Sequence, residues 1–448
     1  MPAATLQGVG IGWRREIAHD LLARPDAVSF VEVVAETCFV RTRTRDEARA
    51  LTETWPVVPH GVKLSLGSAS GIDEDHARRL ARLAKDLRSP WVTEHVAFTR
   101  AGDREIGHLT QLPRTREAVR VLARNVATLR RHLGDVALAL ENIAWTVPWP
   151  DDEMDEATFY QEVVAATGCP LLLDLGNLHA NALNEGLDPA AVLDAFPLEH
   201  VAMAHIAGGD WLETPAGRFF LDTHAHPVMP AIDALLARLV ARRGAVPVVL
   251  ERDANFPPFD ALAQEIVRAR TIVAQAPVRP LAPPRPRPPE ALGGGDLARE
   301  QSVLAALLTA PAPPTAPTPF PPGALAIARE VLRRKRIDDA LPLIPRLAAQ
   351  GIQSRPLAWA AIDARPRAPR SVALNDAWRI AQAALTEEDL RVAATLDALV
   401  LSARSDDDGS SRAPRRGPWL GRRALGGGRA AWAWKSFGAE APVHVLVR

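Results

Sequence analysis

The sequence predicts an α/β fold: a triose-phosphate-isomerase-type (β/α)8 barrel followed by a smaller, mainly helical region. Eight short apolar runs alternate with helical patterns over roughly the first 270 residues, which is typical of a parallel barrel. Acidic and histidine side chains lie at the ends of several of these runs. Beyond Gln275 the chain becomes proline-rich, as expected for a linker between two domains.

The predicted strands are short and bounded by turn residues. The sixth, Leu171 to Leu173, is a continuous apolar run between Pro170 and Gly176, which predicts a buried strand. For the third strand a start at Val57 stays open. The eight strands are expected at Gly8–Trp13, Ser29–Glu36, Gly61–Gly67, Trp91–Phe98, Val136–Ile143, Leu171–Asp174, His200–Gly208 and Val246–Asp253. Helices are expected at Arg14–Ala23, Asp73–Leu87, Thr115–Leu133, Glu156–Thr167 and Pro230–Arg243. The alternative is an open doubly wound sheet, but no Gly-rich phosphate turn supports it.

Composition limits the class of protein. A chain of 448 residues is long enough for two domains. Lys+Arg and Asp+Glu both number 53, so no overall charge favours nucleic acid or an anionic membrane. The two cysteines cannot build a disulfide framework, and no apolar run approaches the roughly 20 residues that span a bilayer. The N-terminus lacks a signal-peptide pattern. We therefore expect a cytoplasmic protein that binds neither nucleic acid nor membrane.

Polar side chains gather where the predicted strands end. Because active sites of parallel barrels form at the carboxyl ends of the strands, we expect these side chains to meet at one mouth. His, Asp and Glu together are ligands for a transition metal rather than for calcium or magnesium alone. The strand ends carry Glu32, Glu36, Glu141, Asn142, Asp174, His205 and Glu251. Glu94 and His95 lie on the fourth strand, His60 lies at the start of the third, and Asp222 and His224 lie in the connection after the seventh.

Each of these residues could also have a purely structural role without binding a metal. A lone histidine on an apolar strand is more often a core residue, and Asp222-Thr223-His224 could be a capped turn. The repetition of the pattern on most strands argues against that interpretation. A mononuclear site needs three or four ligands. Eight of the candidates are too many for such a site and predict two or three metals with a bridging carboxylate: His60, His95, Glu141, Asp174, His205, Asp222, His224 and Glu251.

At this point the sequence resembles a known family, the multinuclear non-haem iron-dependent oxidative enzymes, which include the methanobactin-biosynthesis enzyme. The resemblance covers about Gly8 to Ala274. The matching segments, in the family's order, are GVGIGWR, FVEVVAET, HGVKLSLG, TEHVAF, LALENIAW, LLLDLGNLHANA, VAMAHIAGG and LDTHAHPV. It implies a barrel of the xylose-isomerase type with two or three irons at its mouth.

The resemblance also implies roles for individual residues. It places His60, His95 and Glu141 around one iron, with Glu141 bridging, and Asp174, His205 and Glu251 around a second. Asn177, Asp222 and His224 would hold a third. Glu141, Asp174 and His205 are expected to be the catalytic residues. The chain departs from the commoner form of the family at Gly176, where many members carry Asn.

The implied activity is oxidation of cysteine, or of a neighbouring residue, in a ribosomally synthesised precursor peptide. The implied cofactors are iron, as mixed Fe(II) and Fe(III), and dioxygen as co-substrate. A bound thiol would be deprotonated by the metal. The implied partners are a Cys-containing precursor peptide and a small protein that captures its leader. Two other classes stay open: a sugar isomerase or endonuclease that uses another metal, and a non-catalytic peptide-binding scaffold.

Three regions are expected along the chain. Residues 1–275 form the metal-binding barrel, residues 276–322 a proline-rich linker with one short helix at Leu297–Leu308, and residues 323–448 a mainly helical accessory region. In the accessory region helices are expected at Ala324–Lys335, Asp338–Gln350, Ser371–Ala384 and Glu387–Ala403. The segment from Ser402 to Gly428 is expected to be mobile, and the final residues from Trp432 have strand character.

Overall fold

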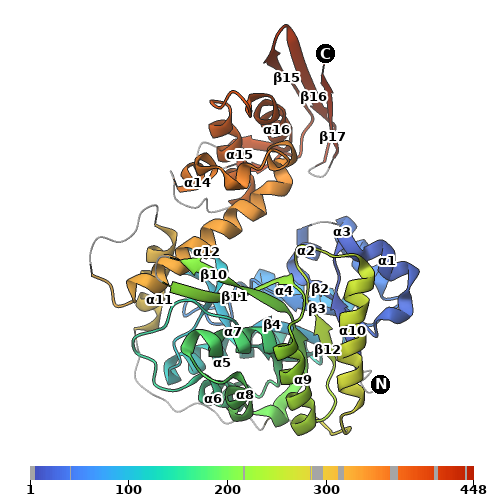
Figure 1. Cartoon of the computed structure of the whole chain (residues 1–448), viewed down its shortest axis with the longest axis vertical. Helices are drawn as coiled ribbons and strands as arrows, with labels where there is room; N and C mark the ends of the chain where they lie inside the picture. Colours follow the sequence, from blue (N-terminus) through green and yellow to red (C-terminus); the bar gives the residue numbers. More distant parts are fainter. Residues whose placement is uncertain are drawn as a thin grey trace. The chain divides into compact units, whose positions relative to one another are not determined.

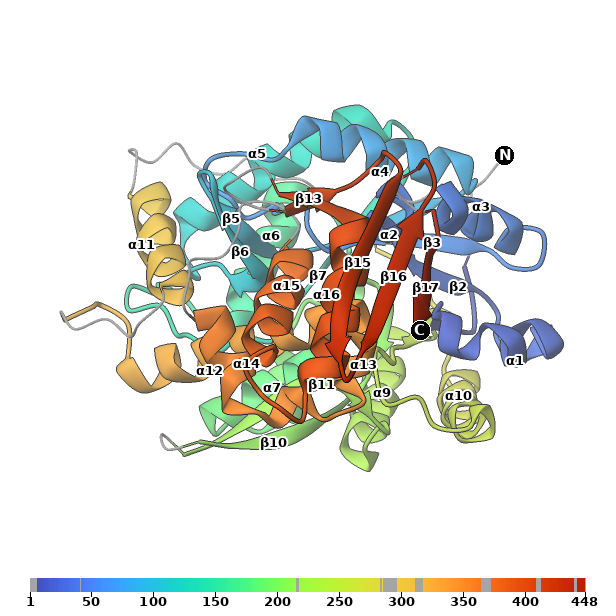
Figure 2. The same ribbon diagram turned by 90° about the horizontal axis from the view of Figure 1, so that it is seen from above.

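The first part of the chain closes into a barrel of eight parallel strands, which confirms the predicted fold class (Figures 1 and 2). The computed structural model describes residues 6–40, 42–214, 217–282, 284, 296–310, 317–363, 372–407, 412–438 and 441–447. The order around the barrel is β1-β12-β9-β8-β7-β4-β3-β2. The strands are β1 (Val9–Gly12), β2 (Val31–Val34), β3 (Val57–Gly61), β4 (Trp91–His95), β7 (Ala137–Glu141), β8 (Leu171–Asp174), β9 (Val201–Ile206) and β12 (Val248–Leu250).

Helices follow the strands and surround them (Figure 2). Five of them start where a side chain accepts a backbone N–H of the first turn: Asp73, Thr115, Asp155, Asp174 and Asp188 cap α4, α5, α6, α7 and α8. The helix α6 ends at Gly168, whose left-handed φ of 64° suits glycine. The helices are α1 (Ala18–Ala23), α2 (Ala35–Val40), α3 (Thr42–Leu51), α4 (Glu74–Asp86), α5 (Arg116–Leu133), α6 (Glu156–Thr167), α7 (Leu175–Glu185), α8 (Pro189–Ala195), α9 (Pro230–Arg243) and α10 (Phe259–Ala274).

Several predicted boundaries were wrong. The third strand is Val57–Gly61 rather than Gly61–Gly67, so the earlier start that the sequence left open is the right one. The second strand ends at Val34, and Glu36 lies in the helix α2. The reason is that strand boundaries are set by pairing with neighbours, as when Val34 pairs with His60.

Two hairpins extend from the barrel and were not predicted. The first, β5 (Ala97–Ala101) with β6 (Arg104–Gln111), follows β4, so the predicted fourth strand ends early, at His95. The second, β10 (Gly208–Thr214) with β11 (Gly217–His226), follows β9. Asp222 and His224, which we expected in the connection after the seventh strand, therefore lie on an antiparallel strand, β11.

The chain divides into two compact units. The first contains residues 1–302 and 319–321, and the second contains residues 303–318 and 322–448. The helix α11 (Leu297–Thr309), which was expected inside the linker, begins in the first unit. The domain limits at 275 and 322 stay a prediction. Among the described residues, no helix combines the length and apolar character needed to cross a bilayer.

Gln301 ties the start of α11 to the barrel unit. Its side chain is 1% exposed, accepts the Ala69 N–H at 2.9 Å and donates to the Gly67 carbonyl at 2.8 Å. We expect Gln301→Ala to lower the free energy of unfolding of the barrel by about 1–3 kcal/mol, because the buried Gly67 carbonyl and the part-buried Ala69 N–H lose their partner. Urea unfolding of the full chain, followed by tryptophan fluorescence, measures this. Ser302→Ala, one residue away and exposed, is the control, and an equal loss there would contradict the assignment.

The second unit is a helical region that ends in a three-stranded sheet. Its helices pack around a core that includes Ile344, Leu347 and Ile380. The expected helix Asp338–Gln350 was wrong, because Pro342 and Pro345 interrupt it. The helix α14 (Pro356–Asp363) was not predicted. The strand character of the final residues is confirmed. The elements are α12 (Pro322–Ala340), α13 (Pro345–Ala348), α14 (Pro356–Asp363), α15 (Val372–Ala384), α16 (Arg391–Arg404), β13 (Ser405–Asp407), β14 (Arg412–Pro414), β15 (Trp419–Gly426), β16 (Arg429–Lys435) and β17 (Val443–Val447).

Candidate metal centre

The polar side chains of the barrel lie directly above an apolar layer. One buried core cluster contains Leu6, Phe30, Val58, Ala139, Leu172, Met203 and Val249. Two residues further along the same chain segments lie, in order from Phe30, Glu32, His60, Glu141, Asp174, His205 and Glu251. Residues two apart on a strand point to the same face, so both sets point into the barrel. The barrel interior therefore changes from apolar to ionisable in one step toward its carboxyl end.

The first group of ligand atoms comes from β3, β4 and β7. His60 Nε2 lies 3.5 Å and His95 Nε2 3.3 Å from Glu141 Oε2. The other ring nitrogens are held from behind: His95 Nδ1 lies 3.0 Å from the Gly61 carbonyl, and His60 Nδ1 lies 2.8 Å from Thr93 Oγ1. A carbonyl can only accept, so His95 Nδ1 carries a proton there. When the imidazole is neutral, this leaves the Nε2 lone pair free for a metal.

The second group surrounds His205. Its Nδ1 lies 3.3 Å from Glu141 Oε1, 3.3 Å from Glu251 Oε2 and 3.9 Å from Asp174 Oδ2. Asp174 also caps α7, because its Oδ1 accepts the Asn177 N–H at 2.7 Å, so only its second oxygen faces the group. The carboxylate of Glu141 has one oxygen in each group. It is therefore placed to bridge two metal ions.

The third group lies at the end of the β10–β11 hairpin. His224 Nε2 is 2.5 Å from Asp222 Oδ2, and His224 Nδ1 is 3.1 Å from Glu251 Oε2. His224 has a left-handed φ of 52°, an unusual conformation for a residue other than glycine. The pair is thus formed by a backbone turn and not by simple alternation along an extended strand. Glu251 faces both His205 and His224, so it links the second group to the third.

Gly176 allows the third group to lie against the helix α7. A Cβ atom at this position would lie 2.9 Å from Asp222 Oδ1 and 3.2 Å from Asp174 Oδ1. The side chain of Asn177, the next residue, donates to the Asn142 carbonyl at 3.0 Å. These contacts hold Asn177 beside Asp174; its role as a metal ligand stays a prediction.

The His and carboxylate atoms are close enough together to hold a metal ion, and several of them lack a hydrogen-bond partner within the protein. The His and carboxylate atoms form four overlapping sets whose members lie within 4.8 Å of one another: His60, His95, Glu141; Glu141, Asp174, His205, Glu251; Glu32, His60, Glu251; and Asp174, Asp222, His224. Several of the buried atoms have no hydrogen-bond partner: Glu141 Oε2, Asp174 Oδ2, His205 Nδ1 and Asp222 Oδ1. Buried polar atoms without partners are costly, and a cation would satisfy them.

The pKa values show the same shortage of positive charge. Burial would lower the pKa of His95, but the carboxylates of Glu141 and Glu94 raise it to about 9. Burial would raise the pKa of Glu141, but His95, His205 and His60 lower it to about 2. Burial, followed by the neighbouring carboxylate of Asp222, raises the pKa of Asp174 to about 8. Protons therefore supply the charge that a metal would otherwise bring.

Glu32 was named at a predicted strand end but was given no role, and Asp253 was missed as a candidate. Glu32 Oε2 lies 3.3 Å from His205 Nε2 and belongs to one of the four sets. Its place at the end of β2 was a usable signal. Asp253 Oδ2 lies 3.6 Å from His224 Nδ1, and Asp253 pairs with Arg14. Its signal was weaker, because it follows the strand end in a loop. Glu36 instead pairs with His76, 3.1 Å away, and accepts the N–H groups after β3.

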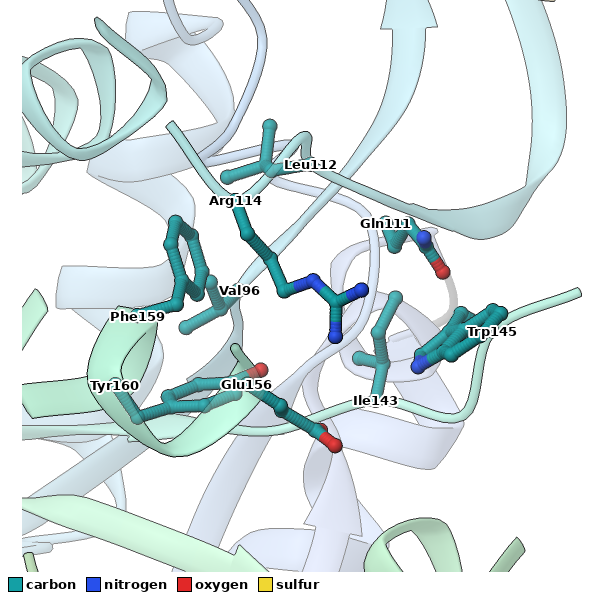
Figure 3. A pocket seen from close by; sticks show the side chains of 9 residues that line it. All are labelled: Val96, Gln111, Leu112, Arg114, Ile143, Trp145, Glu156, Phe159 and Tyr160. Atoms are coloured by element: carbon teal, nitrogen blue, oxygen red, sulfur yellow. The ribbon is translucent and has the colours of Figure 1, made fainter. Parts of the chain in front are cut away.

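A small cavity adjoins the metal centre (Figure 3). It measures about 20 Å³, enough for one water. Val96, the residue after His95, and Ile143, two residues after Glu141, form part of its wall. In Figure 3, Arg114 and Glu156 extend into the space between the aromatic rings. The lining residues are Val96, Gln111, Leu112, Arg114, Ile143, Trp145, Glu156, Phe159 and Tyr160.

Burial raises the pKa of Glu156 in this wall to about 8, from an ordinary value near 4.5. Between these values the unfolded chain loses a proton that the folded chain keeps, so the folded state loses up to about 1.4 kcal/mol per pH unit. We expect Glu156→Gln to remove this loss, since its amide can still accept from Asn181. Denaturation midpoints of both proteins at pH 5 and pH 8 measure it. If the difference between the proteins does not change with pH, the carboxyl ionises normally.

Comparison with known proteins identifies the family. Residues 8–274 match the sequence model of the "RiPP precursor modification enzyme MbnB/TglH/ChrH" family, where RiPP denotes a ribosomally synthesised and post-translationally modified peptide. The chain belongs to this family. The match covers the whole barrel and all nine residues expected to bind metal, and it confirms the resemblance that the eight sequence segments indicated.

Proteins with similar sequences are found in several organisms. A "UPF0276 protein" of Streptomyces avermitilis is 43% identical over 283 residues, which are 61% of this chain and 56% of that protein. A "UPF0276 protein" of Rhizorhabdus wittichii is 38% identical over 58% of this chain and 93% of its own length. Among solved structures, endonuclease IV from Thermus thermophilus covers 60% of this chain and 100% of its own, with 18% identity and a TM-score of 0.38. A xylose isomerase domain protein from Planctomyces limnophilus covers 60% and 94%, with 17% identity and a TM-score of 0.37.

Proposed function

We propose that this chain oxidises cysteine, or a residue next to it, in a ribosomally synthesised precursor peptide, using dioxygen and two or three iron ions at the barrel mouth. The observation that carries the proposal is the sharing of carboxylates. Glu141 faces both the His60–His95 group and His205, and Glu251 faces both His205 and His224. A mononuclear site needs only three or four ligands around one ion, so it would not require a carboxylate between two groups of ligands. Family membership supports a peptide as the substrate.

The proposed ligands divide as the groups do. His60, His95 and Glu141 would hold one ion, Asp174, His205 and Glu251 a second, and Asn177, Asp222 and His224 a third. We add Glu32 as a residue that orients His205, since its carboxylate lies 3.3 Å from His205 Nε2. Bound iron would offer open positions for a thiolate and dioxygen, with mixed Fe(II) and Fe(III) dividing the two tasks.

The protein's own residues would prepare this chemistry. The Gly61 carbonyl and Thr93 hold the rings of His95 and His60, so their Nε2 atoms stay directed at Glu141. The apolar core cluster that includes Phe30, Leu172 and Val249 fills the barrel below the site and keeps water away from that side. Glu141, Asp174 and His205, at the centre of the overlapping groups, are the proposed catalytic residues. A small leader-binding partner protein and a cytoplasmic location remain parts of this proposal.

Metal analysis of protein purified without oxygen tests the proposal. We expect iron at two or three per chain, and dioxygen uptake when a short cysteine-containing peptide encoded beside this chain is added. Zinc, magnesium or manganese in place of iron would favour a sugar-isomerase-like or endonuclease-like activity. A chain that binds none of these metals would be a peptide-binding scaffold. Either result would overturn the proposal.

A further inference from the structure

The sheet of the second unit has one covered face and one exposed face. It is antiparallel, with β16 between β15 and β17. The covered face carries Ala431 and Ala433, which pack with Leu399 of α16 (Figure 1). Side chains alternate along a strand, so the residues between these point to the other side.

The exposed face is apolar and aromatic. Leu420 is 71%, Trp434 43%, Leu446 40% and Trp432 39% exposed. They form a continuous surface, because Leu420 pairs with Trp434 in the sheet register and Trp432 pairs with Leu446. We call these four residues, with Arg422 and His444, the outer face. Neighbouring apolar side chains left exposed on a sheet are typical of a binding surface.

The outer face carries one guanidinium, that of Arg422, and it lies in a basic segment of the chain. The Arg422 guanidinium lies 5.2 Å from the ring centroid of Trp432, and the rings of Trp434 and His444 stack at 5.3 Å. Residues 412–448 contain eight Arg or Lys residues and a single acid, Glu440, although the whole chain has no net charge. This concentration favours an acidic partner.

We propose that the outer face binds an acidic, extended segment of the precursor peptide, outside the part that enters the barrel. The inference rests on the proposed function for the identity of the partner. Within the described residues β15 and β17 each pair only with β16, so the backbone at either edge can accept a further strand. An extended peptide added there places alternate side chains beside the tryptophans and can direct an acidic group toward Arg422. The free backbone edges favour a peptide over a nucleic acid, because a nucleic acid would use the aromatic rings and the basic groups but not the edge of the sheet.

Fluorescence anisotropy with the full chain, under nitrogen, tests the proposal. The probe is a short fluorescein-labelled peptide in which valine and glutamate alternate, and its counterpart has lysine in place of glutamate. We expect the glutamate peptide to bind and the lysine peptide not to bind. The double variant Trp432→Thr/Trp434→Thr should weaken binding by about tenfold or more, as buried tryptophans commonly do at interfaces. Arg422→Glu, at an exposed position that folding tolerates, should do the same.

Matched controls lie on the barrel. Val267→Thr and Arg79→Glu change an exposed apolar and an exposed basic residue there and should leave binding unchanged. Equal binding of the lysine peptide, or no effect of the face variants, would overturn the proposal. So would tighter binding of single-stranded oligothymidylate that the same variants abolish, or a dimer in sedimentation that they dissolve. Iron content is measured separately, so a failure of the iron chemistry is distinguishable from a failure of peptide binding.

Discussion

Glu141→Gln is expected to leave a folded barrel that has lost most of its bound metal. The carboxylate has Oε2 near His60 and His95 and Oε1 near His205, so one substitution weakens two neighbouring ions. The amide keeps the shape of the side chain but loses the charge and one acceptor. We expect at least about a hundredfold weaker retention, above the range typical for residues that only orient ligands. Metal content per chain and the circular dichroism spectrum measure the two parts of the result.

Glu156→Gln is the matched control for this experiment. It makes the same chemical change at a buried glutamate next to the site but outside the four ligand sets. We expect it to keep its metal. Metal loss in both variants would show a general sensitivity of the barrel, and full retention by Glu141→Gln would refute the bridging role. His95→Ala should reproduce the loss, because His95 Nε2 faces the same oxygen.

Asp222→Ala is expected to remove about one metal ion per chain and to leave the others in place. Asp222 contacts His224 on the hairpin, whereas the ligands of the other groups come from barrel strands. Asn177 would add only a neutral amide to the third ion, so this ion should be the most weakly held. Activity should fall strongly if that ion binds or orients the peptide. Metal analysis beside an activity assay separates the two effects.

The alternative outcomes of this substitution are informative. Loss of all metal would show that Glu251, which faces both His205 and His224, makes the three groups one cooperative cluster. Loss of none would show that the contact between Asp222 and His224 near the end of β11 is structural. Thr223→Ala, between the two ligands, is the control for the turn itself, because Thr223 Oγ1 contacts His226 at 2.8 Å.

The barrel and most of its candidate site were predictable because the signals are local. Apolar runs and helical periodicity set the elements, and polar residues two positions beyond the apolar layer mark the strand ends. Glu141, Asp174, His205 and Glu251 were found at the ends of predicted strands, His95 on the fourth predicted strand and His60 beside the third. Which of them share an ion was not predictable from spacing, because the distances between strands depend on how the barrel closes.

The tertiary structure decided the features that depend on segments far apart in the chain. It brought Glu32 to His205, 173 residues away, and Gln301 to Gly67, 234 residues away. It also placed Asp222 and His224 on a hairpin, where a left-handed residue rather than strand alternation joins them. The sequence by itself determined the fold class, through periods of two and 3.6 residues. It also determined the family resemblance, through eight matching segments, and most candidate ligands, through polar residues near predicted strand ends. The shared carboxylates and the exposed face of the terminal sheet required the folded chain, because each depends on which surfaces meet and which remain uncovered.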